Sequence, residues 1–187
     1  MVEGVQVRRL ATAELTPAEI GRIRGLLYDA FAPDAGDDSG GFSGEDWAHA
    51  TGGTHVVLDV DGTIVAHAAV VPRDLRIGHR AVRAGYVEAV ATDPGWQGWG
   101  LGSIVMEAVA DVIRTDFELG ALSTGRDTFY ERLGWTRWKG RTGVRRDGAL
   151  VRTPDDDGGI FLLPGSVPLD LDPKATISCE WRPGDVW

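Results

Sequence analysis

Hydrophobic and polar positions along the chain follow two periodicities, which predicts a protein built from both strands and helices. Short runs of apolar or alternating residues predict strands, and apolar residues at every third or fourth position predict helices. The predicted strands cover residues 5–10, 55–60, 63–71, 75–77, 81–92, 119–123, 135–138, 149–152, 160–163 and 176–181. The predicted helices cover residues 17–32, 45–50, 101–115 and 126–133.

Local signals fix several of these boundaries. Thr16 and Glu19 form a capping box with Pro17 at the first helical position. Asp61-Gly62 predicts a β-hairpin, whereas residues 75–92 read either as a second hairpin or as a long bent strand. The order predicts an α/β (α+β) fold, a mixed sheet covered by helices. Without internal repeats or a linker, residues 1–187 are expected to form a single domain.

A glycine-rich segment joins the strand 81–92 to the helix 101–115. Its sequence is Gln97-Gly98-Trp99-Gly100-Leu101-Gly102. Backbone N–H groups at a helix start, together with the helix dipole, suit a phosphate or pyrophosphate. No Gly-Lys-Ser/Thr follows, so the segment is not a P-loop, and the glycine spacing fits a dinucleotide fingerprint poorly. An ordinary glycine-rich turn is the alternative.

Glu88 is the candidate base in the strand before this loop. Strand alternation puts Tyr86, Glu88 and Val90 on one face. A buried acid in such a strand has a raised pKa, which suits a group that takes a proton from an ammonium. The alternatives are a solvent-facing Glu88, or an ion pair with an arginine of the segment 73–83.

The C-terminal half carries further candidate polar groups. Ser123 ends a predicted central strand, where it either touches substrate or caps the next helix, and Tyr130 lies on the helix 126–133. The turn 155–157 holds three aspartates, and Asp185 lies close to Trp187 at the end of the sequence. Carboxylates around one cavity would bind a polyamine or polyamino sugar, whereas a solvated turn and a merely packed terminus are the alternatives.

Composition narrows the classes of partner. The formal charge of −9 disfavours nucleic acid and anionic membranes as partners. No apolar run is long enough to span a bilayer, and the N-terminus lacks a signal core, so a cytoplasmic location is expected. One cysteine excludes an internal disulfide, and the four scattered histidines lack ligand spacing, so no metal site is predicted and surface or core roles are expected for them.

The loop spacing, with Gln97, Gly100 and Gly102 in the order Q-x-x-G-x-G, resembles the acyl-CoA loop of the GNAT superfamily of N-acetyltransferases. Residues 129–135, Phe-Tyr-Glu-Arg-Leu-Gly-Trp, resemble the end of GNAT domains. The resemblance implies a mostly antiparallel central sheet with helices on both faces and acetyl-CoA as co-substrate. It also implies that Tyr130 protonates the departing thiolate.

Segments spread over residues 84–187 resemble the aminoglycoside 2′-N-acetyltransferases, a family within this superfamily. They are Ala-Gly-Tyr-Val-Glu at 84–88, Leu-Gly-Ala-Leu-Ser at 119–123, Thr-Pro-Asp-Asp-Asp-Gly at 153–158 and Trp-Arg-Pro-Gly-Asp-Val-Trp at 181–187. The resemblance implies direct acetyl transfer from acetyl-CoA to a 2′-amine, with no acyl-enzyme. It implies Glu88 as base through water, the Val90 N–H on the thioester carbonyl and a backbone contact of Thr92 with CoA. The implied substrate ligands are Ser123, Asp156, Asp185 and the Trp187 carboxylate.

The chain departs from that family before Phe42, where Gly41 replaces an acid that contacts the drug. Asp38, or its neighbours Asp34 and Asp37, is expected to supply the missing carboxylate. A homodimer is also expected by analogy with the superfamily. Two alternatives remain: a GNAT enzyme acting on a polyamine, a cell-wall amino sugar or a protein N-terminus, and a non-catalytic acyl-CoA- or drug-binding protein.

Overall fold

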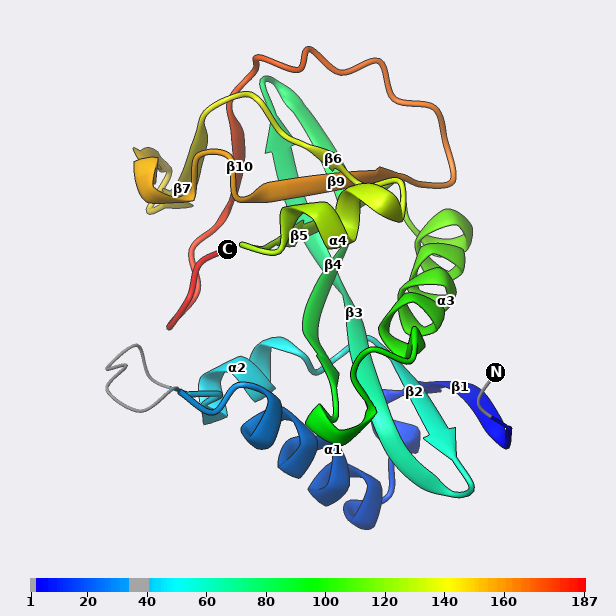
Figure 1. Cartoon of the computed structure of the whole chain (residues 1–187). Coiled ribbons are helices and arrows are strands. Elements are labelled where there is room, and N and C mark those ends of the chain that lie inside the picture. Colours follow the sequence, from blue (N-terminus) through cyan, green and yellow to red (C-terminus); the bar gives the residue numbers. More distant parts are fainter. Residues whose placement is uncertain (1–2, 34–40) are drawn as a thin grey trace. The chain divides into compact units, whose positions relative to one another are not determined.

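The computed structural model describes residues 3–33 and 41–187, whose contacts form two compact units. The first unit comprises residues 1–71 and 87–109, and the second comprises residues 72–86 and 110–187. Three elements run through both units: β3 (Thr63–Ile77), β4 (Arg80–Thr92) and α3 (Leu101–Asp116) (Figure 1). The single domain expected over 1–187 stays a prediction.

The first unit is an antiparallel sheet with two helices between its first two strands. Strand β1 (Val5–Ala11) pairs with β2 (Thr54–Val60), and β2 pairs with the first part of β3 through the predicted hairpin turn. The short 3-10 helix η1 (Thr12–Glu14), α1 (Pro17–Ala30) and α2 (Gly44–His49) lie between β1 and β2 in the sequence. The end of β4, the 3-10 helix η2 (Pro94–Trp96) and the start of α3 complete the unit.

Helix α1 is held by its buried face and by its capping box. Ile23 and Leu27 are fully buried in a cluster with Val57 of β2 and Ile64 of β3. The Thr16 hydroxyl accepts the Glu19 N–H at 3.2 Å, and the Thr16 N–H donates to the Glu19 carboxylate at 2.9 Å. The predicted helix start is therefore confirmed at the residues that the sequence indicated.

The second unit contains the strand order β6-β9-β5-β4-β3-β10-β7-β8. Most pairings are antiparallel, and β4/β5 and β7/β10 are parallel. These observations confirm the mixed, mostly antiparallel sheet with helices. The remaining elements of this unit are β5 (Leu119–Ser123), α4 (Asp127–Arg132), β6 (Thr136–Arg137), β7 (Thr142–Arg146), β8 (Ala149–Arg152), the 3-10 helix η3 (Pro154–Asp156), β9 (Ile160–Pro164) and β10 (Ile177–Glu180).

Three details differ from the sequence-based expectation. Residues 63–71 and 75–77 form one strand, β3, because the alternation of more buried and more exposed positions continues through residues 72–74. Strand β7 was not predicted, although Asp147-Gly148 forms the turn of its hairpin with β8. The helical spacing of apolar residues in 101–115 predicts Ile104 on the buried side of α3, but Ile104 is 36% exposed, whereas Met106 is buried. No helix among the described residues is long and apolar enough to span a bilayer.

Replacing Thr16 with Ala should lower the free energy of unfolding by about 1 kcal/mol, because the N–H of Glu19 loses its capping acceptor. Urea denaturation followed by circular dichroism measures the change. The Thr16→Ser variant keeps the hydroxyl and serves as the control. Equal stability of the Ala and Ser variants would contradict a role for the cap.

Candidate functional site

The glycine segment before α3 has the open backbone that an anion site requires. Gly98 and Gly100 both have a φ of +81°, and a β-carbon at either position would meet no atom within 4 Å. The Gly100 carbonyl accepts the Ser103 N–H at 3.0 Å, which begins the helix. Gln97 ties the loop back to β4, because its side-chain amide donates to the Thr92 carbonyl at 3.2 Å.

The two apolar residues of this segment have contrasting environments. Trp99 is 65% exposed, whereas Leu101 is buried under the first turn of α3. Exposed loop glycines beside a helix N-terminus leave room for a pyrophosphate to approach the amides. The loop therefore has room for the phosphate-bearing part of an acyl-CoA, and its role in binding the co-substrate stays a prediction.

Glu88 lies in β4, where the strand is irregular. Glu88, Ala89 and Val90 are all partly buried, and Ala89 has a φ of +52°. A residue in this left-handed conformation interrupts the pleat. The predicted alternation that would place Tyr86, Glu88 and Val90 on one face therefore does not continue through Ala89. No residue pattern indicates this irregularity, because Ala rarely adopts a positive φ.

Tyr130 lies on α4, with its ring packed edge-on against Phe129 at 5.0 Å and Trp135 at 6.2 Å between centroids. Burial raises the pKa of its hydroxyl to about 12, against a smaller lowering by Arg126. The hydroxyl therefore carries its proton at neutral pH. That is the state from which a general acid donates.

Ser123 ends β5 as predicted and is exposed. It does not cap the next helix: the cap residue of α4 is Arg126, whose N–H is bound by the Thr124 hydroxyl at 2.9 Å. A β-carbon on Gly159 would lie 3.8 Å from the Ser123 hydroxyl oxygen. Ser123 therefore lies beside the turn that carries Asp155, Asp156 and Asp157 (the aspartate turn), in the same unit.

The aspartate turn brings carboxylates together. Asp157 fixes the turn, because it accepts hydrogen bonds from the Thr142 N–H and hydroxyl, both at 2.7 Å. Asp156 differs from it: burial raises the pKa of the Asp156 carboxyl, the Thr153 hydrogen bond opposes this, and the carboxylates of Asp185, Asp155 and Asp157 raise it further. Asp156 thus lies within electrostatic reach of Asp185, and a role of the two carboxylates in binding a substrate stays a prediction.

The C-terminal segment, residues 181–187, packs against the rest of the second unit. Trp187 is only 3% exposed, and its indole N–H donates to the Thr153 hydroxyl at 3.1 Å. The Arg73 guanidinium donates to the Val186 carbonyl and stacks over the rings of Tyr86 and Trp187. Arg73 was not predicted to hold the tail, since it lies far from the tail in the chain and no motif includes it.

The predicted residues fall into two groups. Glu88, Val90, Thr92 and the loop 97–102 belong to the first unit, and Ser123, Tyr130, Asp156, Asp185 and Trp187 belong to the second. Asp38, proposed as the replacement carboxylate, lies outside the described residues, as do Asp34 and Asp37. Within the described ranges, no cluster of His, Cys, Asp or Glu is arranged to hold a metal ion.

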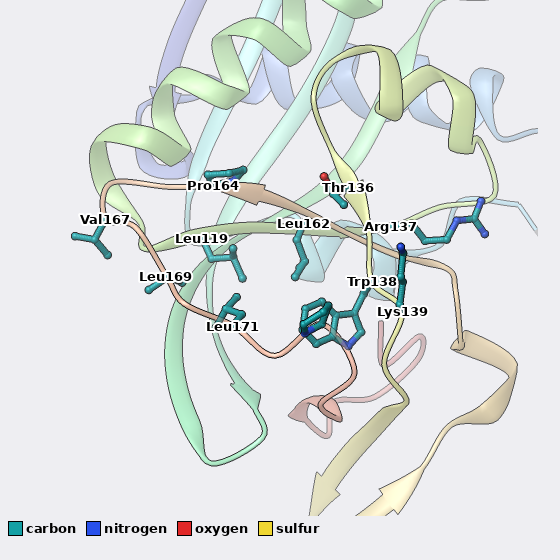
Figure 2. A pocket seen from close by; sticks show the side chains of 11 residues that line it. Leu119, Thr136, Arg137, Trp138, Lys139, Leu162, Pro164, Val167, Leu169 and Leu171 are labelled. Atoms are coloured by element: carbon teal, nitrogen blue, oxygen red, sulfur yellow. The ribbon is translucent and has the colours of Figure 1, made fainter.

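An apolar pocket of about 300 Å³ lies elsewhere in the second unit (Figure 2). Leu119 of β5, Leu162 of β9 and Trp138 line it, together with Leu169 and Leu171 of the segment that follows β9. None of the predicted site residues is among its lining. The pocket is therefore separate from the carboxylates of the aspartate turn and Asp185.

The comparisons with known proteins agree with these features. Residues 22–135 match the model of the acetyltransferase (GNAT) family. The chain is 43% identical over 185 residues to the aminoglycoside 2′-N-acetyltransferase of Mycolicibacterium fortuitum, with 96% of this chain and 91% of that protein covered.

Solved structures show the same fold. A GNAT family acetyltransferase from Brucella melitensis in complex with acetyl-CoA aligns with a TM-score of 0.61 at 20% identity, over 92% of this chain and 94% of that chain. A GCN5-related N-acetyltransferase from Kribbella flavida aligns with a TM-score of 0.56 at 20% identity, over 73% of this chain and 35% of that chain, so this chain spans about a third of that protein. The chain is a GNAT acetyltransferase and belongs to the aminoglycoside 2′-N-acetyltransferase family.

Proposed function

We propose that the chain transfers the acetyl group of acetyl-CoA to the 2′-amino group of aminoglycosides by direct attack in a ternary complex. The 43% identity to the Mycolicibacterium fortuitum enzyme supports this reaction. The observation that carries the proposal is the partly buried Asp156 carboxyl, which lies within electrostatic reach of Asp185 beside the C-terminal segment. Asp156 is partly buried, and a bound ammonium group would stabilise its ionised carboxylate beside the neighbouring negative charges.

The co-substrate supplies an activated acetyl thioester. The amides of the loop 97–102 would hold its phosphates, and the Val90 N–H would donate to the thioester carbonyl oxygen. Attack by the neutral amine forms the C–N bond and breaks the C–S bond. Glu88 would take the amine proton through water, and Tyr130, protonated at neutral pH, would give its proton to the thiolate.

The acceptor would be held in the second unit. Asp156 and Asp185 would pair with ammonium groups, and the Ser123 hydroxyl would bind a sugar hydroxyl or amine. Trp187 would serve mainly to keep Asp185 in place, because the Trp187 N–H donates to the Asp185 carboxylate at 3.2 Å. A homodimer and a cytoplasmic location stay predictions, the first of which analytical ultracentrifugation tests.

The reaction itself is tested by incubating the enzyme with acetyl-CoA and a panel of kanamycin B, kanamycin A, spermidine and glucosamine. Thiol release measures turnover, and NMR of the product locates the acetyl group. Kanamycin B should be acetylated at its 2′-amine, and kanamycin A, which carries a 2′-hydroxyl, should not be acetylated at that ring position. Equal amine acetylation of both kanamycins would overturn the 2′ assignment, and far higher kcat/KM for spermidine or glucosamine would overturn the acceptor.

The Glu88→Gln variant should lose at least about tenfold in kcat, since the base that takes the ammonium proton is absent. The loss should be largest at low pH, where more of the amine is protonated. Steady-state rates between pH 6 and 9, values chosen around an amine pKa of about 8, measure this. Glu107→Gln, on the exposed side of α3, is the control. A full rate in Glu88→Gln would place the base elsewhere.

Drug affinity should weaken as the pH falls through the raised pKa of Asp156, because protonation removes the charge that the ammonium needs. The affinity should therefore be fully present above this pKa and lost below it. Calorimetry of kanamycin B binding between about pH 4 and 8 measures the effect, a range that spans the ordinary aspartate pKa and neutrality. Asp156→Asn should remove the acid limb of the profile, whereas Asp155→Asn, an exposed neighbour, should keep it. An unchanged profile in Asp156→Asn would exclude Asp156 as a ligand.

A further inference from the structure

Two fully buried histidines of the first unit contact each other. His55 lies on β2 and His67 on β3, and both are 0% exposed. The register pairs His55 with Ala69 and Val57 with His67, so the two imidazoles share one face of the hairpin as diagonal neighbours. The distance between His55 Nδ1 and His67 Nε2 is 2.9 Å, a hydrogen bond.

The pair is the centre of a longer hydrogen-bonded chain. On one side, His67 Nδ1 lies 2.9 Å from the carbonyl oxygen of Ala89 in β4. On the other side, His55 Nε2 lies 2.9 Å from the Thr12 hydroxyl, which accepts the Gly52 N–H at 2.9 Å. This hydrogen-bonded chain thus joins the loop before β2 to the irregular part of β4.

Only one placement of the protons satisfies the three bonds that run from Thr12 through His55 and His67 to Ala89; the Thr12 hydroxyl then donates to His55 rather than to the more distant Gly53 carbonyl at 3.4 Å. The Ala89 carbonyl can only accept, so His67 Nδ1 carries a proton. Burial lowers the pKa of His55 to about 4, and burial together with the neighbouring His55 lowers that of His67 to about 3, so both rings are neutral at pH 7. His67 Nε2 therefore accepts from the His55 Nδ1–H, and His55 Nε2 accepts from the Thr12 hydroxyl. Every donor points toward Ala89.

The last bond acts on a particular peptide group. The carbonyl of Ala89 and the N–H of Val90 belong to the same peptide, which is trans. In a trans peptide these two groups point in opposite directions, so fixing the carbonyl also fixes the N–H. Ala89 also has a φ of +52°, a left-handed conformation that is unfavourable for an alanine. A strained peptide in such a position needs support from its surroundings.

We propose that His55 and His67 are positioning residues for acetyl transfer: their hydrogen-bonded chain holds the Ala89–Val90 peptide so that the Val90 N–H is directed at the thioester carbonyl. This inference rests on the proposed function, in which that N–H stabilises the developing oxyanion. Hydrogen bonds in series polarise one another. The chain therefore also makes the Val90 N–H a stronger donor than an isolated amide.

The activity test compares His67→Leu with His67→Asn. Leu removes the donor, whereas the Asn side-chain amide places an N–H near the position of Nδ1. His67→Leu should lower kcat by about ten- to hundredfold, a part of what loss of an oxyanion donor costs, with KM for acetyl-CoA and for kanamycin B changed less than about threefold. His67→Asn should recover most of kcat. His79→Leu, an exposed histidine of the β3–β4 turn, is the matched control.

Rates are referred to the folded fraction, measured by urea denaturation of each variant. A fall in kcat that only follows the folded fraction would overturn the proposal. An Asn variant that is folded but no more active than the Leu variant would overturn it too.

A second readout needs no turnover. NMR of the ¹⁵N-histidine-labelled protein should show His55 and His67 as neutral Nδ1–H tautomers that do not titrate between pH 6 and 8, a range above both lowered pKa values. The Val90 amide resonance should shift in His67→Leu and return toward its original position in His67→Asn. An Nε2–H tautomer at His67, or an unmoved Val90 resonance, would overturn the proposal.

The two proposals fail separately. If kanamycin B is acetylated at its 2′-amine while His67→Leu keeps the normal kcat, the positioning role alone is wrong. If no aminoglycoside is acetylated but the histidine tautomers and the Val90 shift are as expected, the proposed acceptor is wrong and the hydrogen-bonded chain stands as the device that orients the peptide.

Discussion

The left-handed conformation of Ala89 within β4 is the constraint on which the arrangement of the first unit depends. A regular strand through this position would keep Glu88 and Val90 on one face with Ala89 opposite. With a φ of +52° the pleat is interrupted, and residues 88–90 are all partly buried. The strain of about 1–2 kcal/mol is tolerated because Ala89 packs against the α1 core and because its carbonyl accepts the His67 hydrogen bond.

In the second unit, the arrangement depends on the packed C-terminal segment, residues 181–187. Arg73 donates to main-chain carbonyls of the C-terminal segment and stacks on the rings of Tyr86 and Trp187. A planar guanidinium is suited to this combined stacking and hydrogen bonding. The position of Asp185 in turn depends on Arg73, because Arg73 contacts the next two residues, Val186 and Trp187. Bringing Asp185 near the partly buried Asp156 carries an electrostatic cost, which a cationic ligand would offset.

Elements whose pattern is strong and local were predictable from the sequence. Helix α1 begins where the capping box indicates, and β5 has the predicted bounds. Strand β7 was not predicted because only one of its five residues, Val144, is strongly apolar. Thr142 is nevertheless buried there, since its polar atoms bind Asp157 and the Thr153 carbonyl. Burial of a polar residue depends on partners from other segments, and periodicity does not record them.

The sequence by itself determined the glycine loop, the acid before it and the acidic tail, and with them the family. Each of these is a contiguous motif whose chemistry follows from local spacing. Only the tertiary structure decided that Ala89 is left-handed, that His55 and His67 share one hydrogen-bonded chain and that Arg73 holds the tail. These features join residues from separate strands, and their stability comes from burial and from hydrogen bonds between distant segments, which local conformational preference does not specify.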